Sequence, residues 1–173
     1  MRLATTSRLF CLTAVAVMGF FPLPAPASEA VFSASQDFKF LELQRDLREN
    51  PKGPSARQDL FAMGEYYFQE NIPSQAADYF GQLKPSKLKK TEDLLAIVYL
   101  ARCADRIGNA SSVAALKKEL EEALSSNFFF AAFDNQKAWS WKSPLGNRFD
   151  FSERVDRLEI FCNGNPFYVI DLA

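Results

Sequence analysis

The chain has 173 residues, of which 48% are hydrophobic, 14% aromatic and 24% charged, and its formal net charge is −1. This length fits about one globular domain, and the apolar content is too high for an intrinsically disordered chain. The absence of histidine excludes a Ser-His-Asp or Cys-His triad, a histidine-ligated zinc site and a c-type haem attachment. The slightly acidic balance disfavours nucleic acid as a partner, and no cofactor or metal is expected.

The first 27 residues have the layout of a secretory signal peptide. Arg2 and Arg8 precede an apolar run over 9–21, and the small residues of 25–27 stand at a spacing that a signal peptidase reads. A helix as long as this run spans about 20 Å, which is shorter than a hydrocarbon core of about 30 Å. We therefore expect cleavage after Ala27, a periplasmic or secreted protein, and no transmembrane segment in the remainder.

Five helices are predicted in a helical region over 28–126, after a flexible lead-in over 28–35. Apolar residues recur at the helical period in each segment, and Pro, Gly or Asn residues separate the segments. Pro73 suits a first turn, Thr91 suits an N-cap and Gly108 suits a helix end. The predicted helices cover 36–49, 56–70, 74–83, 94–107 and the segment from Ser111 or Ser112 to Leu124.

A β-rich tail is predicted over 127–173 and packs on the helices. Residues 139–141 and 148–151 alternate between apolar and polar types around a turn that contains Pro and Gly. Residues 157–162 and 165–172 flank Asn163-Gly164, the strongest short-range hairpin signal. The Phe-rich segment within 127–137 indicates neither helix nor strand. The sequence thus predicts an α+β protein, with a short antiparallel helix array followed by a small antiparallel β-hairpin unit.

Two cysteines, Cys103 and Cys162, remain after cleavage of the signal peptide. An oxidising compartment would permit a disulfide between them, whereas their apolar surroundings also suit two buried thiols. The sequence leaves both interpretations open. Two cysteines without histidine or a Cys-x-x-Cys motif do not make a metal site.

The second and third predicted helices carry a pattern that recurs about 37 residues later in the fourth and fifth. A duplicated helix pair is typical of an α-solenoid, in which each unit buries its face on the next. The first pair resembles a tetratricopeptide repeat, whose pattern is W-x2-L-G-x2-Y followed by A-x3-F. The corresponding positions are Leu60, Met63, Gly64, Tyr67, Ala76 and Phe80, and they match the pattern except that Leu60 replaces Trp and Met63 replaces Leu. The resemblance covers about residues 56–124 and points to the cell-envelope members of the family. The second helix pair matches the pattern poorly, and the β-rich tail has no counterpart in the family.

This resemblance implies a concave face, lined by the first helix of each pair, that binds an extended peptide or a partner helix. The implied groove residues are Gln58, Phe61, Glu65, Phe68 and Gln69 in the first unit, and Val98, Arg102, Asp105 and Arg106 in the second. Arg102 and Arg106 stand four apart on one helix face and could hold a carboxylate. Phe61 and Phe68 could equally pack against the first helix or the tail. The implied function is a non-catalytic adapter or assembly factor for a protein or peptide partner in the bacterial envelope. Two repeats are few for a solenoid, so the tail would cap the array or the chain would form a homo-oligomer.

The aromatic tail offers an alternative function. Trp139 and Trp141 could stack on a sugar ring, and Asp150, Glu153 and Asp156 are near enough in sequence to suggest a carboxylate pair. Asp150 alternates with phenylalanines and is therefore expected to face water, and a tail this short is small for an active-site cleft. We expect no enzymatic activity. The alternative is a carbohydrate- or peptidoglycan-binding module that uses this aromatic region.

Overall fold

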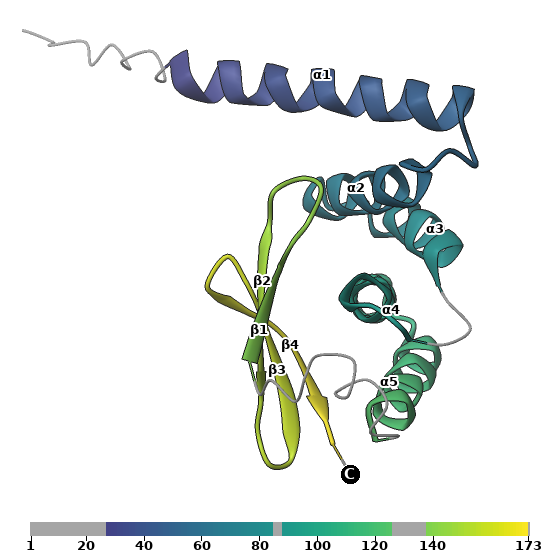
Figure 1. The fold of residues 1–173 in the computed structure, drawn as a ribbon, viewed down its shortest axis with the longest axis vertical. Helices are drawn as coiled ribbons and strands as arrows, with labels where there is room; N and C mark the ends of the chain where they lie inside the picture. The colour runs from purple at the N-terminus through teal and green to yellow at the C-terminus, as the bar shows by residue number, and fades with distance from the viewer. Residues whose placement is uncertain (1–26, 85–87, 126–137, 173) are drawn as a thin grey trace, which may run out of the picture.

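The structure is a computed structural model, and it describes residues 27–84, 88–125 and 138–172. Within them, five helices are followed by a four-stranded antiparallel sheet, which confirms the predicted α+β class. Figure 1 shows the helices α2 to α5 stacked along one side of the molecule, the sheet along the other, and α1 lying across the end near α2. None of the described helices is both long and apolar enough to cross a membrane.

The helices begin and end near the predicted positions, with one difference at the N-terminal side. Their bounds are α1 Ala27–Glu49, α2 Ala56–Gln69, α3 Pro73–Leu83, α4 Thr91–Ile107 and α5 Ala110–Ser125. The predicted flexible lead-in over 28–35 is wrong, because α1 already begins at Ala27. Residues 27–36 contain neither Pro nor Gly, so nothing in them stops a helix. Consecutive helices from α1 to α5 pack against each other.

The helix ends follow ordinary capping chemistry. Asn71 and Gly108 have φ angles of 58° and 78° and end α2 and α4 in left-handed conformations. The predicted N-cap at Thr91 is displaced by one residue, since Lys90 is the cap and Thr91 is the first helical residue. The Asp93 carboxylate provides the capping interaction, because it accepts the backbone amides of Lys89 and Lys90 at 2.9 and 3.0 Å.

The sheet is a meander in the order β1-β2-β3-β4, so β1 and β4 are its edges. The strands are β1 Ala138–Lys142, β2 Arg148–Glu153, β3 Arg157–Cys162 and β4 Asn165–Asp171. Asn163 and Gly164 have φ angles of 51° and 80°, so both residues of the predicted Asn-Gly turn are left-handed as a tight hairpin requires. The undecided segment 127–137 lies outside the described residues.

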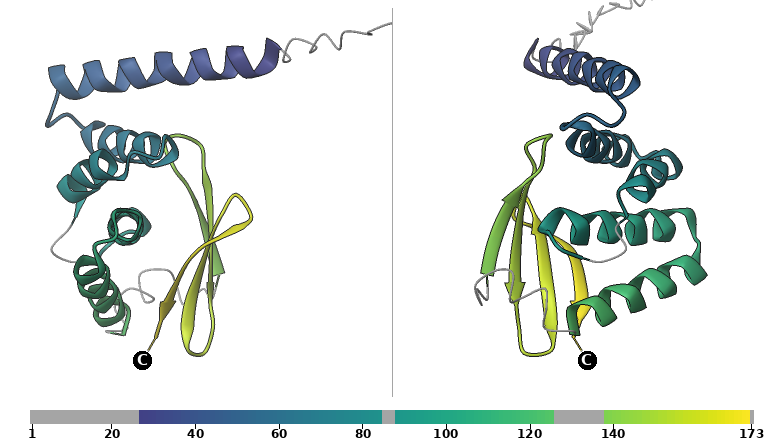
Figure 2. Two further views of the ribbon diagram at one scale, coloured as in Figure 1. Left: turned by 180° about the vertical axis from the view of Figure 1, so that it is seen from behind. Right: turned by 45° about the vertical axis from the view of Figure 1, so that its right-hand side comes forward.

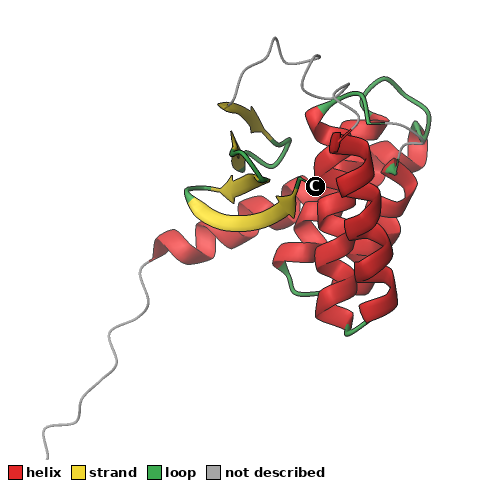
Figure 3. Ribbon diagram, turned by 90° about the horizontal axis from the view of Figure 1, so that it is seen from below, coloured by secondary structure: helices red, strands yellow, loops and turns green. Residues whose placement is uncertain are grey.

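One face of the sheet closes the inner face of the helix array, and the two share a single hydrophobic core (Figures 2 and 3). On the sheet, Phe149 and Phe151 of β2, Leu158 and Ile160 of β3, and Ile170 of β4 are buried. The period-2 alternation of β2 and β3 explains this placement, because alternate side chains point to the same face. The helical region and the tail therefore do not form separate cores.

Candidate functional site

The inner face of the helix array, where the sequence places a partner-binding groove, is covered by the protein's own sheet. Phe61 is fully buried, and its ring lies 5.2 Å from that of Trp141 in β1. Phe68 is buried as well and contacts the ring of Phe167 in β4 at 6.4 Å. Val98 is fully buried in the same core. Of the two roles considered for Phe61 and Phe68, the structure shows packing against the tail.

Glu65 is also fully buried, and it joins the array to the sheet. Its Oε1 atom accepts a hydrogen bond from the Tyr99 hydroxyl at 3.0 Å and another from Asn147 Nδ2 at 3.1 Å. Its Oε2 atom is buried without a hydrogen bond of good geometry, although the Ser143 hydroxyl and the Leu145 backbone lie near the carboxyl group. Burial raises the pKa of Glu65, and these polar neighbours offset part of that rise. The carboxyl group thus acts as a buried polar anchor for the β1–β2 loop.

Tyr99 stands at the centre of an aromatic cluster that spans the helix–sheet boundary. Its ring stacks on Phe80 at 4.4 Å and meets the edges of Phe68 and Phe167 at 5.0 and 5.1 Å. Burial, reinforced by the nearby Glu65 carboxyl, raises the pKa of Tyr99 well above its ordinary value. The phenol is therefore a neutral hydrogen-bond donor in the core, and its role is structural.

Most of the predicted groove residues that remain accessible lie where α2 and α4 end. Gln69, Asp105 and Arg106 are exposed, and Arg102 is half-buried. We call these four residues the open end of the array. Gln58, near the start of α2, is exposed as well.

Two guanidinium groups at the open end are held in place by carbonyl groups and aromatic rings. Arg102 donates to the Phe167 carbonyl at 2.9 Å and lies over the Phe167 ring, with Cζ 4.3 Å from its centroid. Arg106 donates to the Phe68 carbonyl at 2.8 Å and lies 3.7 Å above the Phe68 ring. Stacking and hydrogen bonding fix the planes of both groups before any ligand arrives.

The positive charge of this pair is not neutralised by an ion pair within the described parts of the chain. Burial lowers the pKa of Arg102, and the neighbouring charge of Arg106 lowers it further, whereas Tyr99, Cys162 and Asp105 oppose the shift. Two like charges held side by side repel each other, and an anion placed between them would relieve that repulsion. The geometry of the open end therefore suits an acidic group that would be held electrostatically.

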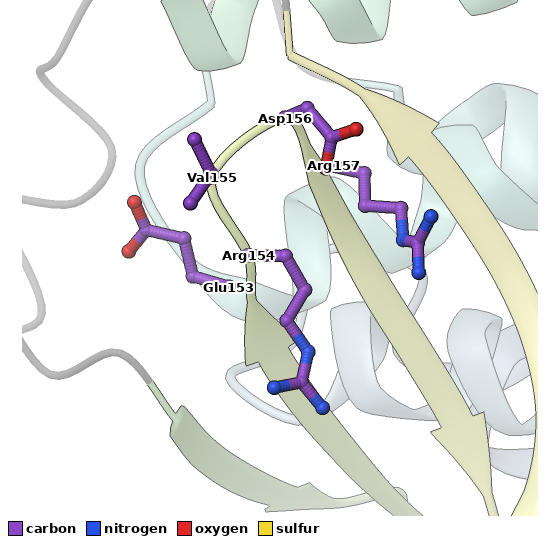
Figure 4. Close-up of a pocket in the computed structure, with 5 residues that line it drawn as sticks. All are labelled: Glu153, Arg154, Val155, Asp156 and Arg157. Carbon is purple, nitrogen blue, oxygen red and sulfur yellow. The ribbon is translucent and has the colours of Figure 1, made fainter.

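The structure does not bring the tail's acidic residues onto its tryptophans. The Trp139 and Trp141 rings pack on the core side, where Trp139 stacks on Phe151 at 4.8 Å. Asp150 pairs with Arg148 at 2.9 Å, in line with its expected orientation toward water. Glu153 and Asp156 lie at the β2–β3 turn, where they line an open hollow, and Figure 4 shows their carboxylates extending to different sides of the turn.

Cys103 and Cys162 are both free thiols in the structure. Cys103 is buried in α4, and Cys162 is half-buried in β3. Burial raises the pKa of each thiol to about 11. Both groups are therefore protonated near neutral pH and are poor nucleophiles. Within the described residues, no cluster of acidic or thiol side chains could hold a metal ion.

Sequence reasoning missed the polar link between Glu65, Tyr99 and Asn147. The partners of Glu65 lie 34 and 82 residues away along the chain, and Asn147 has only the sequence context of a turn residue. The one available signal was a glutamate on the apolar face of α2, which requires a buried partner.

Comparison with known proteins supplies no relative. No protein-family model matches the chain, and no curated protein or solved structure matches it either. The resemblance to tetratricopeptide repeats therefore still rests on the sequence pattern alone.

Proposed function

We propose that this protein is a non-catalytic interaction module of the bacterial cell envelope, which acts as an adapter or assembly factor for a protein or peptide partner. The basis for the compartment is the signal-peptide pattern of residues 1–27. The basis for the class of activity is a stacked helix array whose accessible end offers fixed charges rather than an acid–base or nucleophilic pair.

One observation carries this proposal. Arg102 and Arg106 are fixed by the Phe167 and Phe68 carbonyls and rings, yet neither forms an ion pair within the described residues. Arginine and aromatic side chains dominate the binding energy of protein interfaces, and a rigid guanidinium loses little entropy on binding. An acidic segment of a partner protein fits this surface best.

The test is affinity capture from detergent-solubilised envelope with the tagged chain and two charge-reversal variants. Arg106→Glu changes the exposed member of the pair, and Lys52→Glu reverses a charge in the exposed turn between α1 and α2. We expect a stoichiometric partner that the Arg106→Glu variant loses and the Lys52→Glu variant retains, at equal helical circular dichroism. If both variants retained the same amount of partner, the open end would not be the binding site. Recovery of the untagged chain itself would identify the partner as a second copy.

The alternative proposal, a carbohydrate-binding module, is favoured by one hollow on the sheet. Trp141 lines it together with Lys142 and Arg148. A peptidoglycan fragment that bound there would change the emission of Trp141. A titration followed by tryptophan fluorescence tests this, with Trp141→Phe as the variant that should lose the change. An unchanged spectrum at saturating glycan would refute it.

A further inference from the structure

A second site lies beside the C-terminal half of α2, where α1 crosses the helix array and the β1–β2 loop. A cavity of about 190 Å³ separates these three elements. Its walls include Lys39, Phe40 and Leu43 of α1, Tyr66 of α2, and Leu145 and Asn147 of the loop. Gln69 also lines the cavity and is the one residue that it shares with the open end of the array, whereas Arg102, Asp105 and Arg106 do not line it.

The apolar part of the cavity is preformed. The Phe40 ring stacks on Tyr66 with centroids 4.2 Å apart and an interplanar angle of 28°, and its edge meets Tyr67 at 5.6 Å. These contacts fix the aromatic wall, and Leu43 and Leu145 complete the apolar lining. An apolar group that enters can bury its surface without first reorganising the site.

The polar part of the cavity is dominated by one cation. Lys39 Nζ donates to the Pro144 carbonyl at 3.1 Å, which uses one of its three protons and holds the ammonium group at the rim. Asn147 is already engaged, since its Nδ2 donates to Glu65 and its Oδ1 accepts from Asn163 at 2.9 Å. The lining therefore combines an apolar wall with a positive charge that can still donate two hydrogen bonds.

The volume sets the size of the ligand. An engineered apolar cavity of about 150 Å³ is known to hold benzene, whereas sites for drug-sized ligands occupy about 300–1,000 Å³. A cavity of about 190 Å³ thus admits one ring, or one branched aliphatic group, with a small head group.

We propose that this cavity binds a small monocarboxylate that carries a single aromatic or aliphatic group. The ring lies against Phe40 and Tyr66, and the carboxylate pairs with Lys39. The same chemistry is available in a free aromatic acid and in the C-terminal residue of a peptide. A bound ligand would tie α1 to the β1–β2 loop, which Lys39 and Pro144 already connect.

Saturation-transfer NMR on the purified protein tests this with phenylacetate, and with phenylacetamide and acetate as probes that lack the charge or the ring. With about ten non-hydrogen atoms, phenylacetate should bind with a Kd of the order of 1 mM, and the other two should bind several-fold more weakly. Gly-Gly-Phe distinguishes the sources: tighter binding than phenylacetate assigns the site to a peptide terminus, and weaker binding assigns it to a free acid.

Three variants locate the binding. Phe40→Ala should abolish the phenylacetate signal, whereas Phe38→Ala, at a position on the same helix that is 65% exposed, should retain it. Lys39→Gln should weaken phenylacetate binding about two- to five-fold and leave phenylacetamide unchanged, as expected for an exposed charge pair. Equal binding of phenylacetate and phenylacetamide to the unaltered protein would overturn the proposal. Phenylacetate binding by a Phe40→Ala variant with an unchanged helical circular-dichroism signal would overturn it as well. The test uses no partner protein, so its failure is separate from failure of the adapter function.

Discussion

Gly64 offers a sharp test of how α2 and α3 pack. A Cβ atom added at this position would lie 2.8–2.9 Å from three atoms of the Phe80 ring, closer than real Cβ contacts come. The ring has little room to move, since Phe80 is fully buried, stacks on Tyr99 at 4.4 Å and meets Phe61 at 5.4 Å. The helices approach each other closely here because residue 64 has no side chain.

The expected cost of Gly64→Ala follows from two opposing effects. Overpacking a core costs about 1–3 kcal/mol, whereas replacing a helical Gly by Ala contributes up to about 1 kcal/mol of stability. Gly81 in α3 is the matched control, because a Cβ there meets nothing within 4 Å. Gly81→Ala should therefore stabilise the protein slightly, and Gly64→Ala should be less stable than Gly81→Ala by about 1–3 kcal/mol.

Thermal and urea unfolding followed by circular dichroism measure this difference. For a chain of this length, 1 kcal/mol corresponds to about 2–4 °C in Tm. Combining Gly64→Ala with Phe80→Leu should cost less than the two single changes together, since the smaller side chain makes room for the methyl group. Equal shifts for Gly64→Ala and Gly81→Ala would refute the close approach of α2 to Phe80.

Three further predictions concern buried polar groups and thiols. Burial raises the pKa of Glu65 above 4.5, so the folded protein should lose stability as the pH rises from 4.5 through the folded pKa. Glu65→Gln should remove this loss, which amounts to about 1.4 kcal/mol for each tenfold difference in proton affinity between the folded and unfolded states. Urea midpoints that change with pH in parallel for both proteins would contradict the prediction. Asp93→Ala should destabilise the protein by about 1–3 kcal/mol, because it removes two capping hydrogen bonds and one of the two ion pairs of Arg57, which keeps its pair with Glu92. Equilibrium unfolding measures this loss. Cys103 and Cys162 should react with a thiol reagent at pH 8 much more slowly in the folded protein than in urea, because burial raises the pKa of both thiols to about 11. Rapid labelling without denaturant would count against this prediction.

Local signals in the sequence located most of the elements. The Asn163-Gly164 turn and the alternation in 148–151 and 157–162 predict the sheet, because turn type and side-chain period are properties of neighbouring residues. The same holds for Gly108, whose left-handed conformation ends α4. The start of α1 was missed because Ala- and Ser-rich residues over 27–36 carry no clear apolar period.

Helix periodicity alone could not predict which part of the chain, or which partner, covers the inner face of the helix array. The pattern of α2 shows that Phe61 and Phe68 share its apolar side, but it does not say whether a partner, α1 or the tail covers them. Only the fold places Trp141 and Phe167 there. Arg102 and Arg106 could be singled out by their spacing, whereas the carbonyl groups that fix them lie 65 and 38 residues away.

The closure of the array by the sheet also constrains the order of folding. The contacts that complete the core of α2 and α4 join residues 82 and 65 positions apart in the chain, as Glu65 with Asn147 and Arg102 with Phe167 show. Such long separations slow folding, because the entropy of closing each loop is lost before its contacts form. Until residues 138–171 have joined, Phe61 and Phe68 lack the cover that Trp141 and Phe167 give them. A newly made chain would therefore present an apolar surface that a chaperone could recognise until the sheet docks.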